Sequence, residues 1–139
     1  ATRDLLVNVL RYKPFLIKPN NHELSEIAGV KLTNDNEIVT AARMMQAKGA
    51  RNVLVSMAGD GALLLDEQGG VHRIGCPKGK VVNSVGAGDS MVAGFVAGYQ
   101  QSGGDYAAAL KLGTACGSAT AFSLGLATKA DIDKLLKTM

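Results

Sequence analysis

An apolar run, a helical pattern and a second apolar run follow one another early in the chain, and this succession most constrains the fold. Residues 15–17 read Phe-Leu-Ile, and residues 52–57 are rich in Val and Leu. Between them, residues 38–45 carry apolar side chains at i, i+3, i+4 and i+7, the spacing of an amphipathic helix. Two strands joined by a helix form a βαβ unit, in which the strands lie parallel and the crossover is right-handed. The sequence therefore predicts an α/β fold.

Residues that favour caps and turns mark the ends of these elements. Asn34 is the expected N-cap of the helix and Gly49 its expected C-cap. After the second strand, residues 62–65 and 71–74 are short β-rich runs separated by a turn with two glycines. This pattern predicts a hairpin, so strand pairing should change from parallel to antiparallel.

The last third of the chain is expected to be helical. A helix from residue 89 onward carries Gly94 and Gly98 as a stripe of small residues that would allow close packing. A second helix, over residues 105–122, is apolar almost all round, as a buried helix should be. A third begins at Thr128 with a capping box. Together these elements predict a layered α/β fold with a helical end.

Composition argues against several classes of protein. The 139 residues are 47% hydrophobic, enough for one domain with a core. The net charge of +3, three Tyr, three Phe and no Trp make a nucleic-acid-binding protein a poor fit. Cys76 and Cys116 lie in different segments without metal-ligand spacing, which predicts free thiols and a cytoplasmic protein. His22 and His72 are expected at the surface, and no run of 18 apolar residues suggests a membrane span.

Three polar or glycine-bearing turns each follow a strand-like run. They cover residues 18–23, 56–61 and 86–89. In open α/β sheets, ligands bind beyond the carboxyl ends of the strands. We therefore expect the three turns to share one crevice.

The third turn places a carboxylate behind two glycines at the start of a helix. Gly86 and Gly88 would let a ligand approach the backbone, and the helix would direct its unpaired N–H groups toward the same point. Position 91 is Met, so the dinucleotide motif GxGxxG is not completed. Asp89 is either a favourable acidic residue in the first helical turn or a general base beside an anion hole. From this turn alone, both interpretations remain open.

The chain resembles the ribokinase-like (phosphofructokinase B) sugar kinases. Residues 83–95, Asn-Ser-Val-Gly-Ala-Gly-Asp-Ser-Met-Val-Ala-Gly-Phe, resemble the C-terminal signature of that family. Asn20 and Glu23 fit its NxxE motif, and residues 56–61 resemble its nucleotide loop. The resemblance extends over essentially the entire chain and corresponds to the C-terminal half of such kinases. It implies a three-layer α/β/α fold, of which this chain would hold a βαβ unit, a hairpin and terminal helices.

The same resemblance implies roles for individual residues. Asp89 would be the catalytic base, and the amides of Gly86, Ala87 and Gly88 would form the anion hole. Asn20 and Glu23 would bind Mg²⁺, largely through water. The implied ATP contacts are Lys18, Asn20, Ser56, Met57, Ala58, Gly59, Asp60, Gly61 and Gly88. Ala58 departs from the family pattern, in which many members have Gly.

The implied activity is ATP- and Mg²⁺-dependent phosphorylation of a sugar phosphate. Fructose 1-phosphate, converted to fructose 1,6-bisphosphate, is the first choice of substrate, and tagatose 6-phosphate is the second. Kinases of this kind are longer chains, so residues 1–139 are expected to be a single nucleotide-binding and catalytic part of one. The apolar docking surface left by an absent half would favour self-association. Two alternatives are a nucleotide-binding half without turnover of its own and a non-catalytic anion-binding domain.

Overall fold

The computed structural model describes residues 8–57, 60–77, 86–122 and 128–139, which fall into two compact units. The first unit runs to residue 58 and includes residues 62–73. The second comprises residues 59–61 and 74–139.

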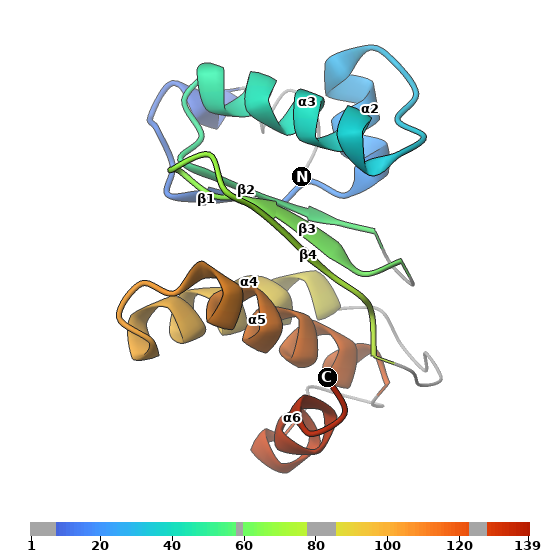
Figure 1. The fold of residues 1–139 in the computed structure, drawn as a ribbon, viewed down its shortest axis with the longest axis vertical. Coiled ribbons are helices and arrows are strands. Elements are labelled where there is room, and N and C mark those ends of the chain that lie inside the picture. The colour runs from blue at the N-terminus through green and yellow to red at the C-terminus, as the bar shows by residue number, and fades with distance from the viewer. Residues whose placement is uncertain (1–7, 58–59, 78–85, 123–127) are drawn as a thin grey trace. The chain divides into compact units, whose positions relative to one another are not determined.

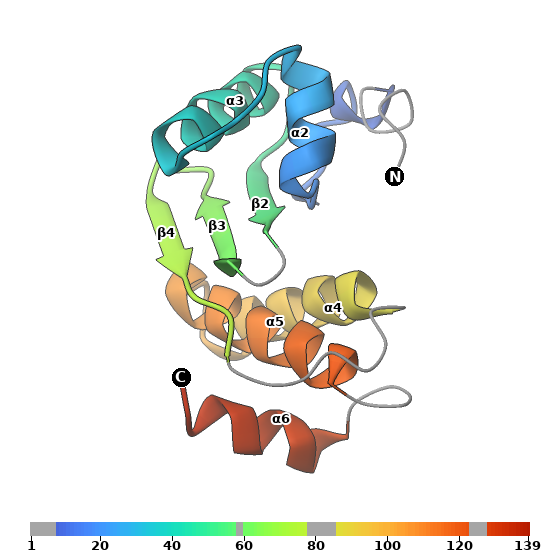
Figure 2. The same cartoon turned by 90° about the vertical axis from the view of Figure 1, so that its right-hand side faces the viewer.

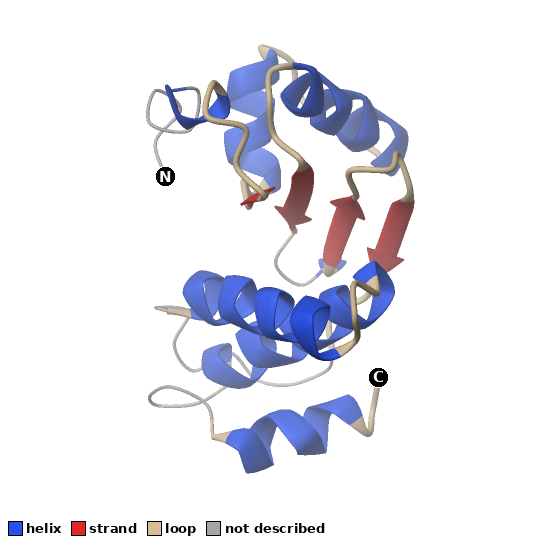
Figure 3. Cartoon of the chain, turned by 90° about the vertical axis from the view of Figure 1, so that its left-hand side faces the viewer, coloured by secondary structure: helices blue, strands red, loops and turns tan. Residues whose placement is uncertain are grey.

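The first unit is built on a mixed sheet with the strand order β1-β2-β3-β4. The strands are β1 (Leu16–Ile17), β2 (Asn52–Ser56), β3 (Ala62–Leu65) and β4 (Val71–Ile74). β1 pairs with β2 in parallel, whereas β2 pairs with β3 in antiparallel orientation. Figure 3 shows the arrows of β3 and β4 pointing in opposite directions. The predicted change from parallel to antiparallel pairing is confirmed.

Two helices, α2 (Asn21–Ala28) and α3 (Asp35–Ala47), lie over one face of this sheet (Figure 1). The Asn34 side chain caps α3 by accepting a hydrogen bond from the Glu37 amide at 2.9 Å, as predicted. The C-cap is Lys48, one residue before the predicted Gly49. Gly49 is needed for another reason, because a Cβ there would lie 1.9 Å from the Leu10 carbonyl oxygen.

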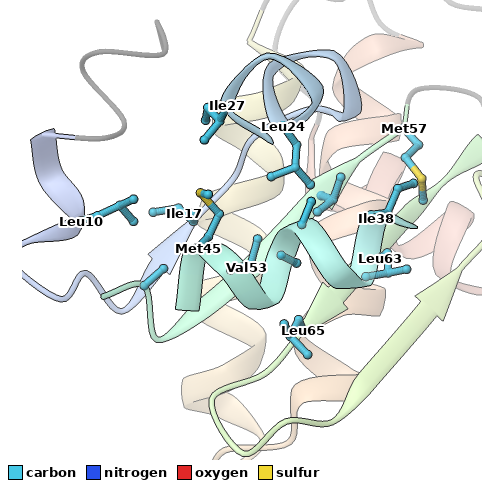
Figure 4. Packing of buried hydrophobic residues seen from close by; sticks show 14 residues of the cluster. Leu10, Ile17, Leu24, Ile27, Ile38, Met45, Val53, Met57, Leu63 and Leu65 are labelled. Atoms are coloured by element: carbon cyan, nitrogen blue, oxygen red, sulfur yellow. The ribbon is translucent and has the colours of Figure 1, made fainter. Parts of the chain in front are cut away.

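The core of the first unit lies between the two helices and the sheet (Figure 4). Alternate strand residues point to the same face, so Val53 and Val55 of β2 lie on one side together with Leu63 and Leu65 of β3. Burial of one such side chain stabilises the fold by about 1.5–3 kcal/mol. The helices contribute Leu24, Ile27, Ile38, Ala41, Ala42 and Met45 to the same core.

A buried carboxylate organises the turn between β3 and β4. Asp66 is 5% exposed, and its Oδ1 accepts hydrogen bonds from the amides of Gln68 at 2.9 Å and Gly70 at 3.0 Å. Its Oδ2 lies 2.7 Å from His72 Nε2. Burial raises the pKa of Asp66, but the His72 hydrogen bond and the two amides outweigh it and lower that pKa. His72 thus pairs with a buried acid while its own side chain stays 28% exposed at the surface, and it is the pairing that the sequence did not predict.

The second unit consists mainly of α4 (Ala87–Gln101), α5 (Tyr106–Ala121) and α6 (Lys129–Leu136). All three helices were predicted, and Thr128 forms the predicted capping box with Asp131. α4 and α5 lie side by side, and α6 packs on α5 (Figure 2). A Cβ on Gly94 would lie 2.9 Å from the Cβ of Cys116, which confirms the small-residue stripe. Among the described helices, none has the length and apolar character needed to cross a membrane.

We expect Gly94→Ala to destabilise the second unit. The added methyl group would lie 2.7 Å from Cys116 Sγ and 3.1 Å from the Gly113 Cα, so α4 and α5 would have to move apart. The expected loss is about 1–3 kcal/mol in the free energy of unfolding, measured by urea titration. Gly75→Ala is the matched control, because among the described residues, its chain neighbours apart, no heavy atom lies within 4 Å of a Cβ there. Unchanged stability in Gly94→Ala would contradict the close packing.

We expect Asp66→Asn to lower the free energy of unfolding by about 1–3 kcal/mol at neutral pH, because an amide cannot accept all three hydrogen bonds. The folded-state pKa of Asp66 is lowered, so its contribution is present above the ordinary value of 3.8 and is lost as the pH falls through the folded value. Urea titrations from neutral to acidic pH should show the two proteins converging at low pH. Glu26→Gln, an exposed change in the same unit, should show no such convergence.

Candidate active site

The carboxyl ends of β1 and β2 lie next to each other at one edge of the sheet. An isolated parallel bridge joins Asn20, just beyond β1, to Ser56, the last residue of β2. The Ser56 amide donates a hydrogen bond to the Pro19 carbonyl oxygen at 3.1 Å. The structure thus brings together the first two of the three predicted turns, as expected for the ends of parallel strands.

Asn20 and Glu23 form a capping box at the start of α2. Asn20 Oδ1 accepts from the Glu23 amide at 2.8 Å, and Glu23 Oε1 accepts from the Asn20 amide at 3.0 Å. These two residues therefore form the start of a helix, with each side chain bonded to the backbone of the other. Capping explains both residues structurally, and their part in metal binding stays a prediction.

Positive charge lies close to the Glu23 carboxylate. Partial burial raises the pKa of Glu23, whereas the hydrogen bond from the Asn20 amide and the charge of Lys18 lower it, and on balance the pKa is lowered. Glu23 is therefore ionised at neutral pH. Across the described ranges, no group of three or more His, Cys, Asp or Glu side chains is placed to hold a metal ion.

The expected nucleotide loop begins at the same sheet edge. Ser56 is half-buried, whereas Met57 is 6% exposed and belongs to the core, so only its backbone could face a ligand. Asp60 is exposed. Gly61 has φ +93°, and a Cβ there would lie 2.0 Å from the Ile74 carbonyl oxygen, so packing alone requires glycine. Ala58 and Gly59 lie outside the described residues.

The third turn forms the N-terminus of α4 in the second unit. Gly86 is the N-cap, with φ +82°, and it provides no side-chain cap. Ala87 and Gly88 are half-buried, and Asp89 is exposed in the first turn. Within the described ranges, no hydrogen bond or ion pair engages the Asp89 carboxylate. In the part of the chain that the structure describes, Asp89 therefore makes no capping hydrogen bond, and no side chain caps the amides of the first turn.

The open groove described on the first unit lies away from these residues. It has a volume of about 480 Å³, contains none of the predicted site residues, and runs along α3 and the segment after α2. Its lining residues are Ala28, Val30, Leu32, Asn34, Asn36, Glu37, Thr40, Ala41 and Met44.

One contact near the third turn was not predicted. The Thr120 hydroxyl on α5 donates a hydrogen bond to Ser90 Oγ on α4 at 2.9 Å. The two residues are 30 positions apart. Helical periodicity and capping preferences describe neighbours along one helix, so no sequence signal could have found this pair.

The first comparison with known proteins concerns sequence. Residues 2–133 match the protein family described as "pfkB family carbohydrate kinase". It is 47% identical over 133 residues to a 1-phosphofructokinase of Bacillus subtilis, covering 96% of this chain and 43% of the relative. It is 42% identical over 135 residues to a D-tagatose-1-phosphate kinase of Bacillus licheniformis, again covering 96% and 43%. The chain therefore spans less than half the length of these relatives.

The second comparison concerns structure. The crystal structure of a candidate phosphofructokinase from Staphylococcus aureus superimposes with a TM-score of 0.92 and 41% identity, covering 99% of this chain and 44% of that one. This match confirms the predicted α/β fold class. Together with the match over residues 2–133, it confirms the resemblance inferred from residues 83–95 and from Asn20 and Glu23. The chain belongs to the pfkB family of carbohydrate kinases.

Proposed function

We propose that this chain is the nucleotide-binding and catalytic part of an ATP-dependent sugar-phosphate kinase. One observation carries the proposal. The helices α2, α3, α5 and α6 each have a side-chain N-cap, whereas α4 begins at a glycine and holds in its first turn an exposed Asp89 that has no partner among the described residues. Open amides beside a carboxylate are what transfer of a phosphoryl group to a hydroxyl requires.

In the proposed mechanism, Asp89 accepts the proton of the attacking sugar hydroxyl. The amides at residues 86–88 and the positive end of the α4 dipole stabilise the negative charge on the phosphoryl oxygens during transfer. The exposure of Asp89 lets a substrate hydroxyl reach it. The glycines at 86 and 88 leave room for the phosphoryl group against the backbone.

The residues at the sheet edge of the first unit fit the proposed Mg²⁺ and ATP. Asn20 and Glu23 offer amide and carboxylate oxygens, which Mg²⁺ prefers, and the lowered pKa of Glu23 keeps its carboxylate charged. Bound there, the ion would neutralise charge on the nucleotide phosphates. Lys18 would contact the same phosphates as a point charge. The backbone from Ser56 to Gly61 would complete the nucleotide site.

Fructose 1-phosphate is the proposed sugar substrate, with fructose 1,6-bisphosphate as the product. The support is the 47% identity to the Bacillus subtilis relative, named as a 1-phosphofructokinase. The second candidate is a tagatose phosphate, because another relative is named a D-tagatose-1-phosphate kinase. That name puts the phosphate at position 1, whereas the sequence suggested tagatose 6-phosphate. A nucleotide-binding half without turnover and a non-catalytic anion-binding domain remain the competing proposals.

The proposal also covers the cellular location of the chain and its self-association. The two units would act as one catalytic part in the cytoplasm, and apolar surface that a further half would cover would drive self-association. Light scattering at increasing protein concentration measures this: a rising mass is expected, and a constant monomer mass would contradict it.

We expect Asp89→Asn to reduce turnover by about 100-fold or more, because the amide cannot accept the hydroxyl proton. ATP affinity should be largely retained, since the backbone amides are unchanged. Turnover is measured as sugar-dependent ADP release with fructose 1-phosphate, fructose 6-phosphate and the two tagatose phosphates, alongside the full-length Bacillus subtilis relative. ATP affinity is measured by calorimetry.

Asp131→Asn is the matched control for this variant. Asp131 occupies the corresponding first-turn position of α6, but it serves in a capping box. Its replacement should leave turnover unchanged. Near-normal turnover of Asp89→Asn would refute the proposed base. ATP binding by the unaltered chain without ADP release would instead favour a binding part that lacks turnover.

We expect Glu23→Gln to weaken the Mg²⁺ dependence of ATP binding by about tenfold or more. Gln also serves at the third position of a capping box, so the free energy of unfolding should change by less than about 0.5 kcal/mol. Calorimetric ATP titrations at several Mg²⁺ concentrations measure the effect and do not require turnover. An unchanged Mg²⁺ dependence at unchanged stability would mean that Glu23 only caps α2.

A further inference from the structure

We propose that Thr120 is a positioning residue, which acts through the Ser90 hydroxyl to hold the first turn of α4, and with it Asp89, in the orientation needed for phosphoryl transfer. This inference rests on the proposed function. It starts from one contact: Thr120, 3% exposed, donates to Ser90 Oγ at 2.9 Å. Ser90 directly follows Asp89.

The C-terminal turns of α5 pack against the N-terminal turns of α4. A Cβ on Gly117 would lie 3.0 Å from the Ala87 carbonyl oxygen and 3.1 Å from the Met91 Cβ. A Cβ on Gly113 would lie 2.8 Å from the Met91 carbonyl oxygen. Ala87 is the first residue of α4. The backbone of α5 therefore touches the same turn that carries the candidate anion hole.

These glycine contacts fix the distance between the helices but do not fix the rotation of α4 about its axis. Contacts between small and apolar groups are not directional, so a small rotation would preserve most of them. A hydrogen bond is directional and weakens steeply when its angle is distorted. The hydrogen bond from Thr120 to Ser90 joins the same two helices at the turn that carries Asp89. It can therefore set the direction in which the neighbouring Asp89 points.

The first turn of α4 needs such support because its N-cap residue, Gly86, has no side chain to cap the helix. Elsewhere a side-chain N-cap ties the first turn to the residues before it, as Asp105 does for α5 by accepting from the amides of Ala107 and Ala108. Gly86 cannot do so. The Thr120 hydroxyl supports the turn from the side and leaves the amides open to a ligand.

The test compares Thr120→Val with three other variants. Thr120→Val keeps the shape of the side chain and removes the hydroxyl, Thr120→Ser keeps the hydroxyl, and Ser90→Ala removes the acceptor. Thr114→Val is the matched control, because Thr114 is also buried in α5 and its hydroxyl has no partner within the described ranges. Thermal unfolding of all four variants records the stability of each.

Two readouts separate positioning from a merely structural role. The first is kcat and KM for ATP in the sugar-dependent ADP assay. The second is hydrogen exchange of the Ser90 amide, which donates to the Gly86 carbonyl oxygen at 2.9 Å, compared with the Phe95 amide further along α4. For Thr120→Val we expect kcat to fall about tenfold with KM unchanged, and Ser90 exchange to rise about 5- to 10-fold without a change at Phe95.

The expected pattern includes rescue: Thr120→Ser should return both readouts toward those of the unaltered chain, and Ser90→Ala should resemble Thr120→Val. The inference is overturned when Thr120→Val behaves like Thr114→Val in both readouts. If the unaltered chain releases no ADP with any sugar phosphate, the proposed turnover fails. The exchange at Ser90 then decides by itself whether Thr120 holds the first turn of α4.

Discussion

The buried side chain of Asn52 sets the strand register on which the first unit depends. Its Nδ2 donates to the Phe15 carbonyl oxygen at 2.8 Å, and its Oδ1 accepts from the Glu67 amide at 2.8 Å. One fully buried amide thus ties β1 and the hairpin to the start of β2. The pairing of Leu16 with Asn52 continues without a slip to the bridge between Asn20 and Ser56. A polar contact at one end of the strands therefore places the candidate nucleotide site at the other end.

The second unit achieves its alignment with glycines. Gly94, Gly113 and Gly117 let α4 and α5 approach so closely that a methyl group at any of them would lie about 3 Å or less from the facing helix. Such packing is sensitive to single atoms, because neighbouring side chains leave no space into which a misfit can relax. In the first unit, the register of β1 and β2 thus places Asn20 beside Ser56. In the second unit, the glycine contacts place the first turn of α4, which carries Asp89.

Local rules predicted much of this molecule. Capping preferences and helical periodicity identified the start of α3 at Asn34 and the start of α6 at Thr128, because these signals depend on residues a few positions apart. The rule for parallel strand ends predicted that Asn20 and Ser56 lie together. The pair of Asp66 and His72 and the buried Asn52 were missed, because their partners are brought together only by the folded sheet. The chemical roles of Asp89, Asn20 and Glu23 were inferred from the resemblance to the kinase family, because capping rules cannot reveal a chemical role.

The same local rules also show which helix lacks a stabilising N-cap side chain. At the N-cap, Asn stabilises a helix by about 0.5–2 kcal/mol relative to Ala, but by only about a few tenths of a kcal/mol relative to Gly. α2 has Asn20 at this position where α4 has Gly86, so the stability forgone in α4 is small. Natural sequences depart from local preferences mainly at functional or strained sites, because only there does the departure serve another purpose. Asn20 and Glu23 satisfy the rule, so capping suffices to explain them and a chemical role needs separate support. Gly86 departs from it, because it supplies no side-chain cap, and among the described residues the Asp89 side chain makes no capping hydrogen bond in its place. The physical argument for function is therefore stronger at the start of α4 than at the start of α2.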